Sequence, residues 1–253
     1  MEDLKGKVVL ITGSSTGIGA AVARAFGANQ CKVAVHYNRS EGPARQVVRD
    51  IEAAGGEVIA LQADVTVSAA IKSLVEQTVS RFGRIDVLIN NAGDLVSRRP
   101  ITEMTDEFFD QVAHLNMRSV LMACKEAVPH MRRQGGGNII NVTSIAARHG
   151  GGGGALLYAA SKGFVSTVTR GMAKEFVGDN IRVNAVSPGV IATPFHERHT
   201  SAEQMEAFNA GIPMRRAGTP DECTGTFLYL ASNRLSGYVT GQIVEVNGGQ
   251  LMP

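Results

Sequence analysis

The chain has 253 residues, of which 44% are hydrophobic and 19% are charged, and its formal net charge is +2. This balance is typical of a folded globular protein, and it argues against a disordered chain or one built to bind nucleic acid. No run of about 18 apolar residues occurs, so no membrane span is predicted. The polar first residues lack the apolar core of a signal peptide, so we expect a cytoplasmic protein. Three widely spaced cysteines form no CxxC pair, which predicts neither a disulfide framework nor a bound metal.

Short runs rich in valine and isoleucine recur along the chain and predict β-strands. Most of them are continuously apolar rather than alternating, a pattern typical of parallel strands that are buried on both faces. The predicted strands are residues 7–12, 32–36, 57–62, 87–90, 138–143, 182–187 and 242–247.

Between these runs, apolar residues recur with the period of an α-helix. The predicted helices cover residues 18–28, 71–82, about 105–131 and 156–176. Alternating strands and helices imply right-handed crossovers. We therefore predict an α/β fold, a single Rossmann-type, doubly wound domain over residues 1–253 with a seven-stranded parallel sheet flanked by helices on both faces. No linker-like segment or internal repeat divides the chain.

The first predicted strand leads into a glycine-rich turn that opens a helix. Glycine lets the backbone turn sharply and approach a ligand closely, and the start of a helix offers free N–H groups to a pyrophosphate. Glycines at such a turn can also be purely structural. The position after the first strand of an α/β chain favours a dinucleotide site. The residues expected there are Gly13, Ser15, Thr16, Gly17, Ile18 and Gly19.

The end of the second predicted strand indicates which dinucleotide is bound. Sites for NAD usually carry an acidic residue there, which holds the ribose 2′-hydroxyl. Here the chain reads Tyr37-Asn38-Arg39-Ser40, and the first carboxylate is Glu41. Arg39 can pair with a 2′-phosphate and Ser40 can add a hydrogen bond, so we predict NADP(H), with NAD(H) as an alternative. The competing interpretation is that Arg39 is a solvated loop residue.

Tyr158 and Lys162 are four residues apart and share one helix face. A free tyrosine has a pKa of about 10, which is high for a base near neutrality. A neighbouring lysine ammonium and a cationic nicotinamide ring would both favour the phenolate. A Tyr–Lys pair alone is common on helices and is usually structural, so its setting decides its meaning.

Taken together, these motifs resemble the short-chain dehydrogenase/reductase family over nearly the whole chain. Each motif is weak alone, but all of them together in the family's order are improbable by chance. The matching segments are Thr12–Gly19, Asp64-Val65, Asn90-Asn91-Ala92-Gly93, the four positions Asn116, Ser144, Tyr158 and Lys162, and Ser187-Pro188-Gly189 with Thr193.

The resemblance implies the catalytic roles. Tyr158 is implied to be the general acid in reduction and the base in oxidation, while Lys162 binds the nicotinamide ribose and lowers the tyrosine pKa. Ser144 would polarise the substrate oxygen, and Asn116 would hold a water that links Lys162 to solvent. Without the family, Ser144 could be a turn residue, and Asn116 a helix residue bonded to backbone. The remaining implied cofactor contacts are Tyr37, Asn38, Arg39, Ser40, Asp64, Val65, Asn91, Ala92, Gly93, Tyr158, Lys162, Pro188, Gly189, Ile191 and Thr193.

Two segments near the implied substrate site are distinctive. Ser144 and Tyr158 lie fourteen positions apart, one more than is usual in the family. We place the extra residue in the glycine-rich stretch 150–154, which we expect to be mobile, and we expect its ends to keep the catalytic groups in register. Residues 190–213 resemble the family's variable substrate lid, in which Ser201 and Gln204 could cap a short helix.

The leading functional hypothesis is reduction of a 3-oxoacyl thioester carried on acyl carrier protein, for which Arg132, Arg133 and Lys174 are candidate docking residues. The alternative is an NAD(P)-dependent sugar, polyol or secondary-alcohol dehydrogenase, because the lid carries polar residues such as His196, Glu197 and His199. A third hypothesis, from another class, is a nucleotide-sensing protein without turnover. The resemblance also implies a homotetramer.

Overall fold

The computed structural model describes residues 1–252, and seven strands in this range form one parallel sheet in the order β3-β2-β1-β4-β5-β6-β7. The predicted α/β class and seven-stranded parallel sheet are therefore confirmed. The strand order changes direction beside β1, where open parallel sheets carry their ligand crevice. The strands are β1 (Val8–Ile11), β2 (Lys32–Tyr37), β3 (Glu57–Gln62), β4 (Val87–Asn90), β5 (Gly137–Val142), β6 (Ile181–Pro188) and β7 (Ile243–Val246).

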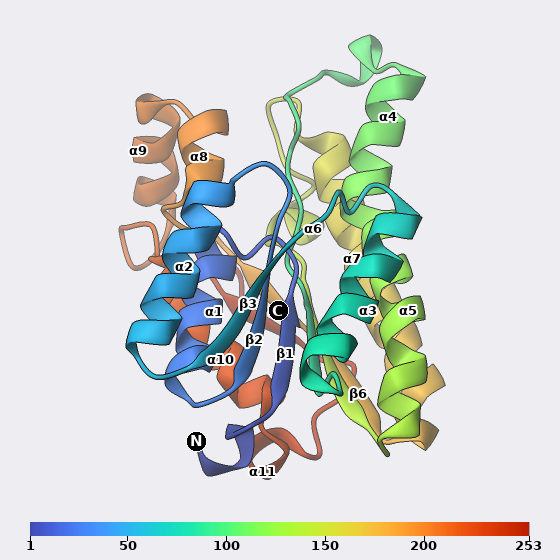
Figure 1. Cartoon of the computed structure of the whole chain (residues 1–253). Helices are drawn as coiled ribbons and strands as arrows, with labels where there is room; N and C mark the ends of the chain where they lie inside the picture. The colour runs from blue at the N-terminus through green and yellow to red at the C-terminus, as the bar shows by residue number, and fades with distance from the viewer. Residues whose placement is uncertain (253) are drawn as a thin grey trace.

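Helices cover both faces of the sheet, as Figure 1 shows. Helices α1, α2 and α10 pack on one face, and α3, α5 and α7 pack on the other. Short 3-10 turns lie at Glu2–Leu4, Ile101–Glu103 and Val177–Asp179. The helices are α1 (Gly17–Ala28), α2 (Glu41–Ala53), α3 (Ser68–Phe82), α4 (Asp106–Ala113), α5 (Ser119–Arg133), α6 (Ala146–His149), α7 (Leu156–Phe176), α8 (Pro194–His199), α9 (Ala202–Gly211), α10 (Pro220–Ala231) and α11 (Asn233–Ser236).

The continuous apolar runs of the central strands follow from this layering. Val9 and Ile11 of β1 pack into the core beneath α1 and α10, whereas Leu10 between them packs into the core beneath α3 and α5. All three side chains are fully buried. Successive side chains of a strand point to opposite faces, so a strand covered on both faces needs apolar residues at every position.

The structure corrects the long helix that was predicted over about 105–131. Helix α4 ends at Ala113, a π-helical turn follows over His114–Arg118, and α5 continues from Ser119. The N–H of Ser119 donates to the carbonyl of His114 five residues earlier, the hydrogen-bond pattern of a π-turn. Such turns frequently occur at functional sites. Helical periodicity alone does not reveal a change in hydrogen-bond pattern within one helix.

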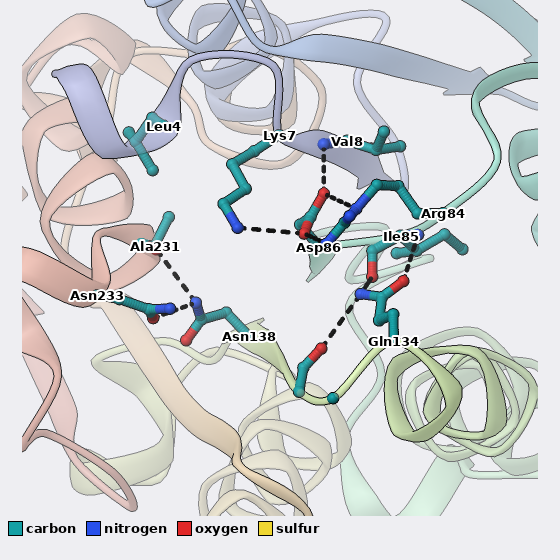
Figure 2. A network of polar contacts seen from close by, with 12 residues as sticks. Leu4, Lys7, Val8, Arg84, Ile85, Asp86, Gln134, Asn138, Ala231 and Asn233 are labelled. Atoms are coloured by element: carbon teal, nitrogen blue, oxygen red, sulfur yellow. Dashed lines mark hydrogen bonds and ion pairs between the residues drawn. The ribbon is translucent and has the colours of Figure 1, made fainter.

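A polar network ties together the amino ends of the strands (Figure 2). The carboxylate of Asp86, which is only 5% exposed, accepts hydrogen bonds from the backbone N–H of Val8 at 2.9 Å and from the Lys7 and Arg84 side chains. The side-chain amide of Asn138 donates to the carbonyl of Ala231 at 3.1 Å. These contacts fix the end of the sheet opposite the crevice. Among residues 1–252, no helix combines the length and hydrophobicity that a membrane span needs.

Candidate active site

A cleft of about 890 Å³ opens at the carboxyl ends of the strands, and its volume is typical of ligand sites. Twenty-one of the predicted site residues line it, and Asp64 and Asn116 do not. The lining residues are Gly13, Ser15, Thr16, Gly17, Ile18, Gly19, Tyr37, Asn38, Arg39, Ser40, Val65, Asn91, Ala92, Gly93, Ser144, Tyr158, Lys162, Pro188, Gly189, Ile191 and Thr193, with Tyr158 and Lys162 serving in both predicted sets.

The glycines of the turn between β1 and α1 are required for two reasons, backbone conformation and close packing. Gly13 and Gly17 have φ of +64° and +56°, values that side chains other than glycine rarely adopt. A Cβ added to Gly19 would lie 2.4 Å from the carbonyl oxygen of Gly13, so this glycine is required by close packing. The side-chain amide of Asn91 donates to the carbonyls of Thr12 and Gly13 and holds the turn. Thr16 makes no side-chain cap on α1, so the first N–H groups of that helix remain available to an anion.

A histidine that the sequence analysis gave no role supports the same turn. His36 is 2% exposed, and its Nδ1 accepts a hydrogen bond from the Gly13 N–H at 2.8 Å. Its Nε2 lies 3.0 Å from the carbonyl oxygen of Ala63, so Nε2 carries the proton and the ring is neutral. Burial lowers the pKa of His36, while the bond to Ala63 and the charge of Asp64 act in the opposite direction. The available signal was a histidine inside an otherwise apolar strand.

The end of β2 presents Arg39 and Ser40 to the cleft. Arg39 is exposed, and within residues 1–252 it makes no ion pair. The carboxylate of Asp64 accepts hydrogen bonds from the N–H and hydroxyl of Thr66, and Asp64 does not line the cleft. Those bonds lower the pKa of Asp64. Val65 lines the cleft in its place.

Tyr158 and Lys162 project from α7 toward Ser144, which follows β5. The Lys162 ammonium donates to the carbonyl of Val142 at 2.9 Å and lies 5.7 Å from the centre of the Tyr158 ring. Burial lowers the pKa of Lys162 to about 8. Burial raises the pKa of Tyr158 to about 12, the hydrogen bond with Ser144 lowers it, and the negative charge of Asp94 raises it. Burial therefore has the largest effect on the pKa of Tyr158 in the protein alone, and the lowering expected from Lys162 and a cationic nicotinamide ring stays a prediction.

Asn116 lies in the π-turn behind Lys162 and is 1% exposed. Its side-chain nitrogen donates to the carbonyls of Asp94 and Val112, and its side-chain oxygen accepts the N–H of Asp94 at 3.1 Å. A Cβ on Gly93 would lie 2.7 Å from that oxygen and 3.1 Å from Lys162 Nζ, so Gly93 leaves room for both groups. The Asn116 side chain is thus bonded to backbone groups, as the alternative interpretation expects. Because it also lies close to Lys162, its role in a proton relay remains a proposal.

The glycine-rich loop between Ser144 and Tyr158 is held by the segment that follows Gly93. Arg98 Nη1 donates to the carbonyls of Gly152 and Gly153, and the Arg99 N–H donates to the carbonyl of Gly154 at 3.0 Å. Gly154 has φ of +81°, and a Cβ there would lie 2.8 Å from the Arg99 nitrogen. Gly150, Gly151, Gly153 and Gly154 have left-handed backbone conformations, which lets the loop accommodate the extra residue. Ser144 remains hydrogen-bonded with Tyr158. The expectation that the catalytic groups keep their register agrees with this geometry.

The predicted lid segment, residues 190–213, contains α8 and α9, which lie at the top left of Figure 1. Ser201 and Gln204 form the expected capping box at the start of α9. Thr193 packs toward the glycine turn, because a Cβ on Gly17 would lie 3.3 Å from its methyl group. Phe195 lies 5.6 Å from the ring of Tyr158. Lid residue Glu197, which was expected to suit polar substrates, is exposed and does not line the cleft.

The basic residues that were considered for carrier docking lie away from this cleft. Arg132 and Arg133 end α5, which leads into the amino end of β5, and Lys174 ends α7 just before the amino end of β6. Arg132 is also engaged by Asp179 at 2.8 Å. A parallel sheet has its ligand crevice at the carboxyl ends of its strands, so these three residues are at the opposite end from the cleft of their own chain.

Known proteins are similar to this chain in sequence and in structure over nearly its full length. The family described as enoyl-(acyl carrier protein) reductase matches residues 13–250. A 3-oxoacyl-[acyl-carrier-protein] reductase of Synechocystis is 40% identical over 252 residues, covering 100% of both chains. The 3beta-hydroxysteroid dehydrogenase 1 of Eggerthella lenta is 38% identical, covering 99% of this chain and 96% of that protein.

The crystal structure of NADH-dependent reductase A1-R', responsible for alginate metabolism, has a TM-score of 0.92 and 41% identity, covering 100% of both chains. The same reductase has a structure in complex with NAD. These relatives are oxidoreductases whose names give different reactions. The chain is an oxidoreductase and belongs to the short-chain dehydrogenase/reductase family, whose members use a nicotinamide cofactor.

Proposed function

We propose that this protein reduces a carbonyl group to a secondary alcohol with NADP(H), with Tyr158, Ser144, Lys162 and Asn116 at the reaction centre. The observation that carries the proposal is the placement of the Tyr158 phenol beside Ser144 and Lys162, next to the glycine turn in one cleft. The cleft fits a dinucleotide because of its volume, its left-handed glycines and the uncapped start of α1.

A bound nicotinamide would supply or accept the hydride at the carbonyl carbon. The residues handle the proton at the oxygen. Ser144 donates a hydrogen bond that polarises the carbonyl, and Tyr158 then transfers its phenolic proton to the oxygen. A raised tyrosine pKa keeps the phenol protonated at neutral pH, which suits the acid role in reduction. Lys162 would bind the nicotinamide ribose, and its ammonium stabilises the phenolate that remains.

The choice of NADP(H) over NAD(H) rests on Arg39 and Ser40. The guanidinium of Arg39 is exposed at the rim of the cleft and no carboxylate of the described chain pairs with it, so it is free to pair with a 2′-phosphate. The relatives include an NADH-dependent reductase, so cofactor preference is not a property of the fold. Asp64 is proposed to act indirectly, by shaping the turn that carries Val65.

For the substrate, we favour a small polar oxo compound such as an oxidised sugar or polyol. Charged and polar side chains line the substrate end of the cleft beside Phe195 and Phe208. These polar residues are Arg98, His149, His196, Arg198 and Gln204. Hydroxyl groups of a polar substrate would give them hydrogen-bond partners.

A 3-oxoacyl thioester is the second candidate. It is favoured by the 40% identity with the Synechocystis 3-oxoacyl-[acyl-carrier-protein] reductase over the full length of both chains. It is disfavoured by the position of Arg132, Arg133 and Lys174 at the opposite end from the cleft. Docking of a carrier protein would therefore require other basic residues, or a second copy of this chain.

A substrate panel tests these alternatives. Oxidised sugars, simple ketones and acetoacetyl thioesters are each assayed with NADPH and NADH by the absorbance of the reduced nicotinamide. Turnover of polar oxo compounds above thioesters is expected, and the reverse order would replace the first candidate with the second. Tyr158→Phe should abolish turnover while leaving NADPH affinity nearly unchanged. Near-full activity in this variant would refute the proposed mechanism, and cofactor binding without any turnover would favour a nucleotide sensor.

A further inference from the structure

Asp94 is the residue immediately after the Asn-Asn-Ala-Gly motif, and it connects two parts of the site. Its backbone is held on both sides by the side-chain amide of Asn116, which accepts the Asp94 N–H at 3.1 Å and donates to the Asp94 carbonyl at 2.9 Å. Its carboxylate reaches the lid helix α8, where it accepts from His199 Nε2 at 2.8 Å and from Arg198 at 3.3 Å. One residue therefore joins the catalytic asparagine to the lid.

Helix α8 depends on such contacts for its position. It has six residues, none of them fully buried, and Thr193 at its start makes no side-chain cap. Isolated helices of this length are unstable in water, so tertiary contacts must hold it. At its far end the His199 side chain is 11% exposed and bonded to Asp94, and the His199 carbonyl accepts from Arg98 Nε at 3.0 Å.

The hydrogen bond between His199 and Asp94 also bears on the position of Phe195, the α8 side chain that faces Tyr158. The ring of Phe195 packs edge-on against His199, with centroids 5.1 Å apart, and also lies 5.6 Å from the ring of Tyr158. A shift of His199 would therefore move the wall of the cleft that faces the reacting oxygen. Arg98, which holds the same residue by its backbone, also holds the glycine-rich loop on the other side of the cleft.

We propose that Asp94 and His199 form a latch that positions α8 over the substrate end of the cleft and couples lid closure to the turn held by Asn116. Both are positioning residues that act through Phe195 and the Asp94 backbone, and the charge of Asp94 in addition raises the pKa of Tyr158. The expected effect of the latch on catalysis rests on the proposed function. The physical latch is a property of the chain itself, so it can be tested without substrate.

Hydrogen–deuterium exchange of the protein without cofactor tests the latch directly. The amides of Glu197 and Thr200 are bonded within α8, to the carbonyls of Thr193 and His196. Asp94→Ala leaves the sequence of α8 unchanged and should speed exchange of both amides by about tenfold, the loss expected for a partly exposed, charge-assisted bond. His199→Ala should give a similar increase, and the double variant should add little. His199→Gln should largely restore protection, because its amide can donate to Asp94.

Glu197→Gln is the matched control, since it removes an exposed acidic charge of the same helix that lies outside the cleft lining. It should leave the exchange of Thr200 unchanged. Thermal unfolding reports whether each variant folds. Unchanged exchange in Asp94→Ala and His199→Ala, in folded protein, would overturn the latch.

Kinetics then separate the latch from the proposed function. Asp94→Ala should raise KM for the carbonyl substrate more than it lowers kcat, with NADPH affinity unchanged, and His199→Gln should recover most of the loss. A purely structural defect would lower kcat and cofactor affinity together, and that result would overturn the positioning role. A protein that shows the exchange pattern but turns over no carbonyl would support the latch and refute the proposed function.

Discussion

His36 provides the sharpest test of how the glycine turn is held. Its two ring nitrogens have different partners, the Gly13 N–H at Nδ1 and the Ala63 carbonyl at Nε2. Asparagine can place an acceptor oxygen near the position of Nδ1, whereas glutamine can place a donor nitrogen near the position of Nε2. His36→Asn therefore keeps the contact with the turn, and His36→Gln keeps only the contact with Ala63.

The expected magnitude follows from the group that loses its partner. A partly buried N–H left unsatisfied costs about 1–3 kcal/mol, and a looser turn loses part of its fit to a pyrophosphate. We expect His36→Gln to weaken NADPH binding by about tenfold, near the low end of that range. His36→Asn should weaken it by less than about threefold. Neither variant should change kcat at saturating cofactor, because the His36 ring bonds to the glycine turn and to Ala63 and not to Tyr158.

Titration of NADPH fluorescence measures the two affinities, and chemical denaturation measures the two stabilities. If the two variants bind NADPH equally well, the turn does not depend on the Nδ1 contact. If kcat falls in both while affinity is unchanged, His36 acts on the reaction centre and the argument is wrong.

The same histidine predicts a pH dependence of stability. Burial lowers the pKa of His36 below its ordinary value of 6.5, so the unfolded chain takes up this proton more readily than the folded protein. The free energy of unfolding should therefore fall as pH decreases below 6.5, by up to about 1.4 kcal/mol per pH unit from this group. Protonation of Nδ1 would also place a donor against the Gly13 N–H. His36→Asn lacks this proton, so its stability should fall less steeply with acid. Parallel curves for the two proteins would contradict this assignment.

Three further changes test other parts of the structure. Arg39→Ala should raise the Kd for NADPH much more than that for NADH, and equal losses would remove the cofactor argument. Gly19→Ala should destabilise the protein, because its Cβ would lie 2.4 Å from a carbonyl oxygen. Gly225 is an exposed position of helix α10 with open space around it, so Gly225→Ala should stabilise the protein by about 0.5–1 kcal/mol in the same thermal assay. Asp86→Ala should lower the free energy of unfolding by about 1–3 kcal/mol, with unchanged NADPH affinity, since it leaves a buried N–H unpaired far from the cleft.

The sequence predicted the sheet well because the physical signal is local and strong. Strands buried on both faces need continuous apolar runs, and the seven observed strands overlap the seven predicted runs. Helices α2 and α10 were not assigned, and both lie on the sheet face formed with α1. The π-turn at Asn116 was invisible because it changes hydrogen bonding without changing the apolar pattern.

In the candidate site too, features encoded by short local motifs were predicted, and features that depend on other contacts were not. Residues tied to short motifs, such as those of the glycine turn and Tyr158 with Lys162, line one cleft as expected. Asp64 lies outside the cleft lining and its carboxylate is bonded to Thr66, a contact two residues away that the motif does not encode, so its contact with the cofactor stays a prediction. The effect of burial on the tyrosine pKa was not predicted, since burial depends on residues far apart in the chain.

The glycine-rich loop shows why the substrate was the hardest property to predict. Its length suggested a mobile segment that could disturb Ser144, yet Arg98 and Arg99 fix it through three backbone carbonyls. Arg98 also holds His199 of the lid, so a single side chain sets the distance between the two walls of the cleft. These contacts join segments more than fifty residues apart, and only the folded chain brings them together. The proposed catalytic residues follow from motifs, whereas the shape of the cleft depends on how Arg98 and Asp94 hold the glycine-rich loop and helix α8.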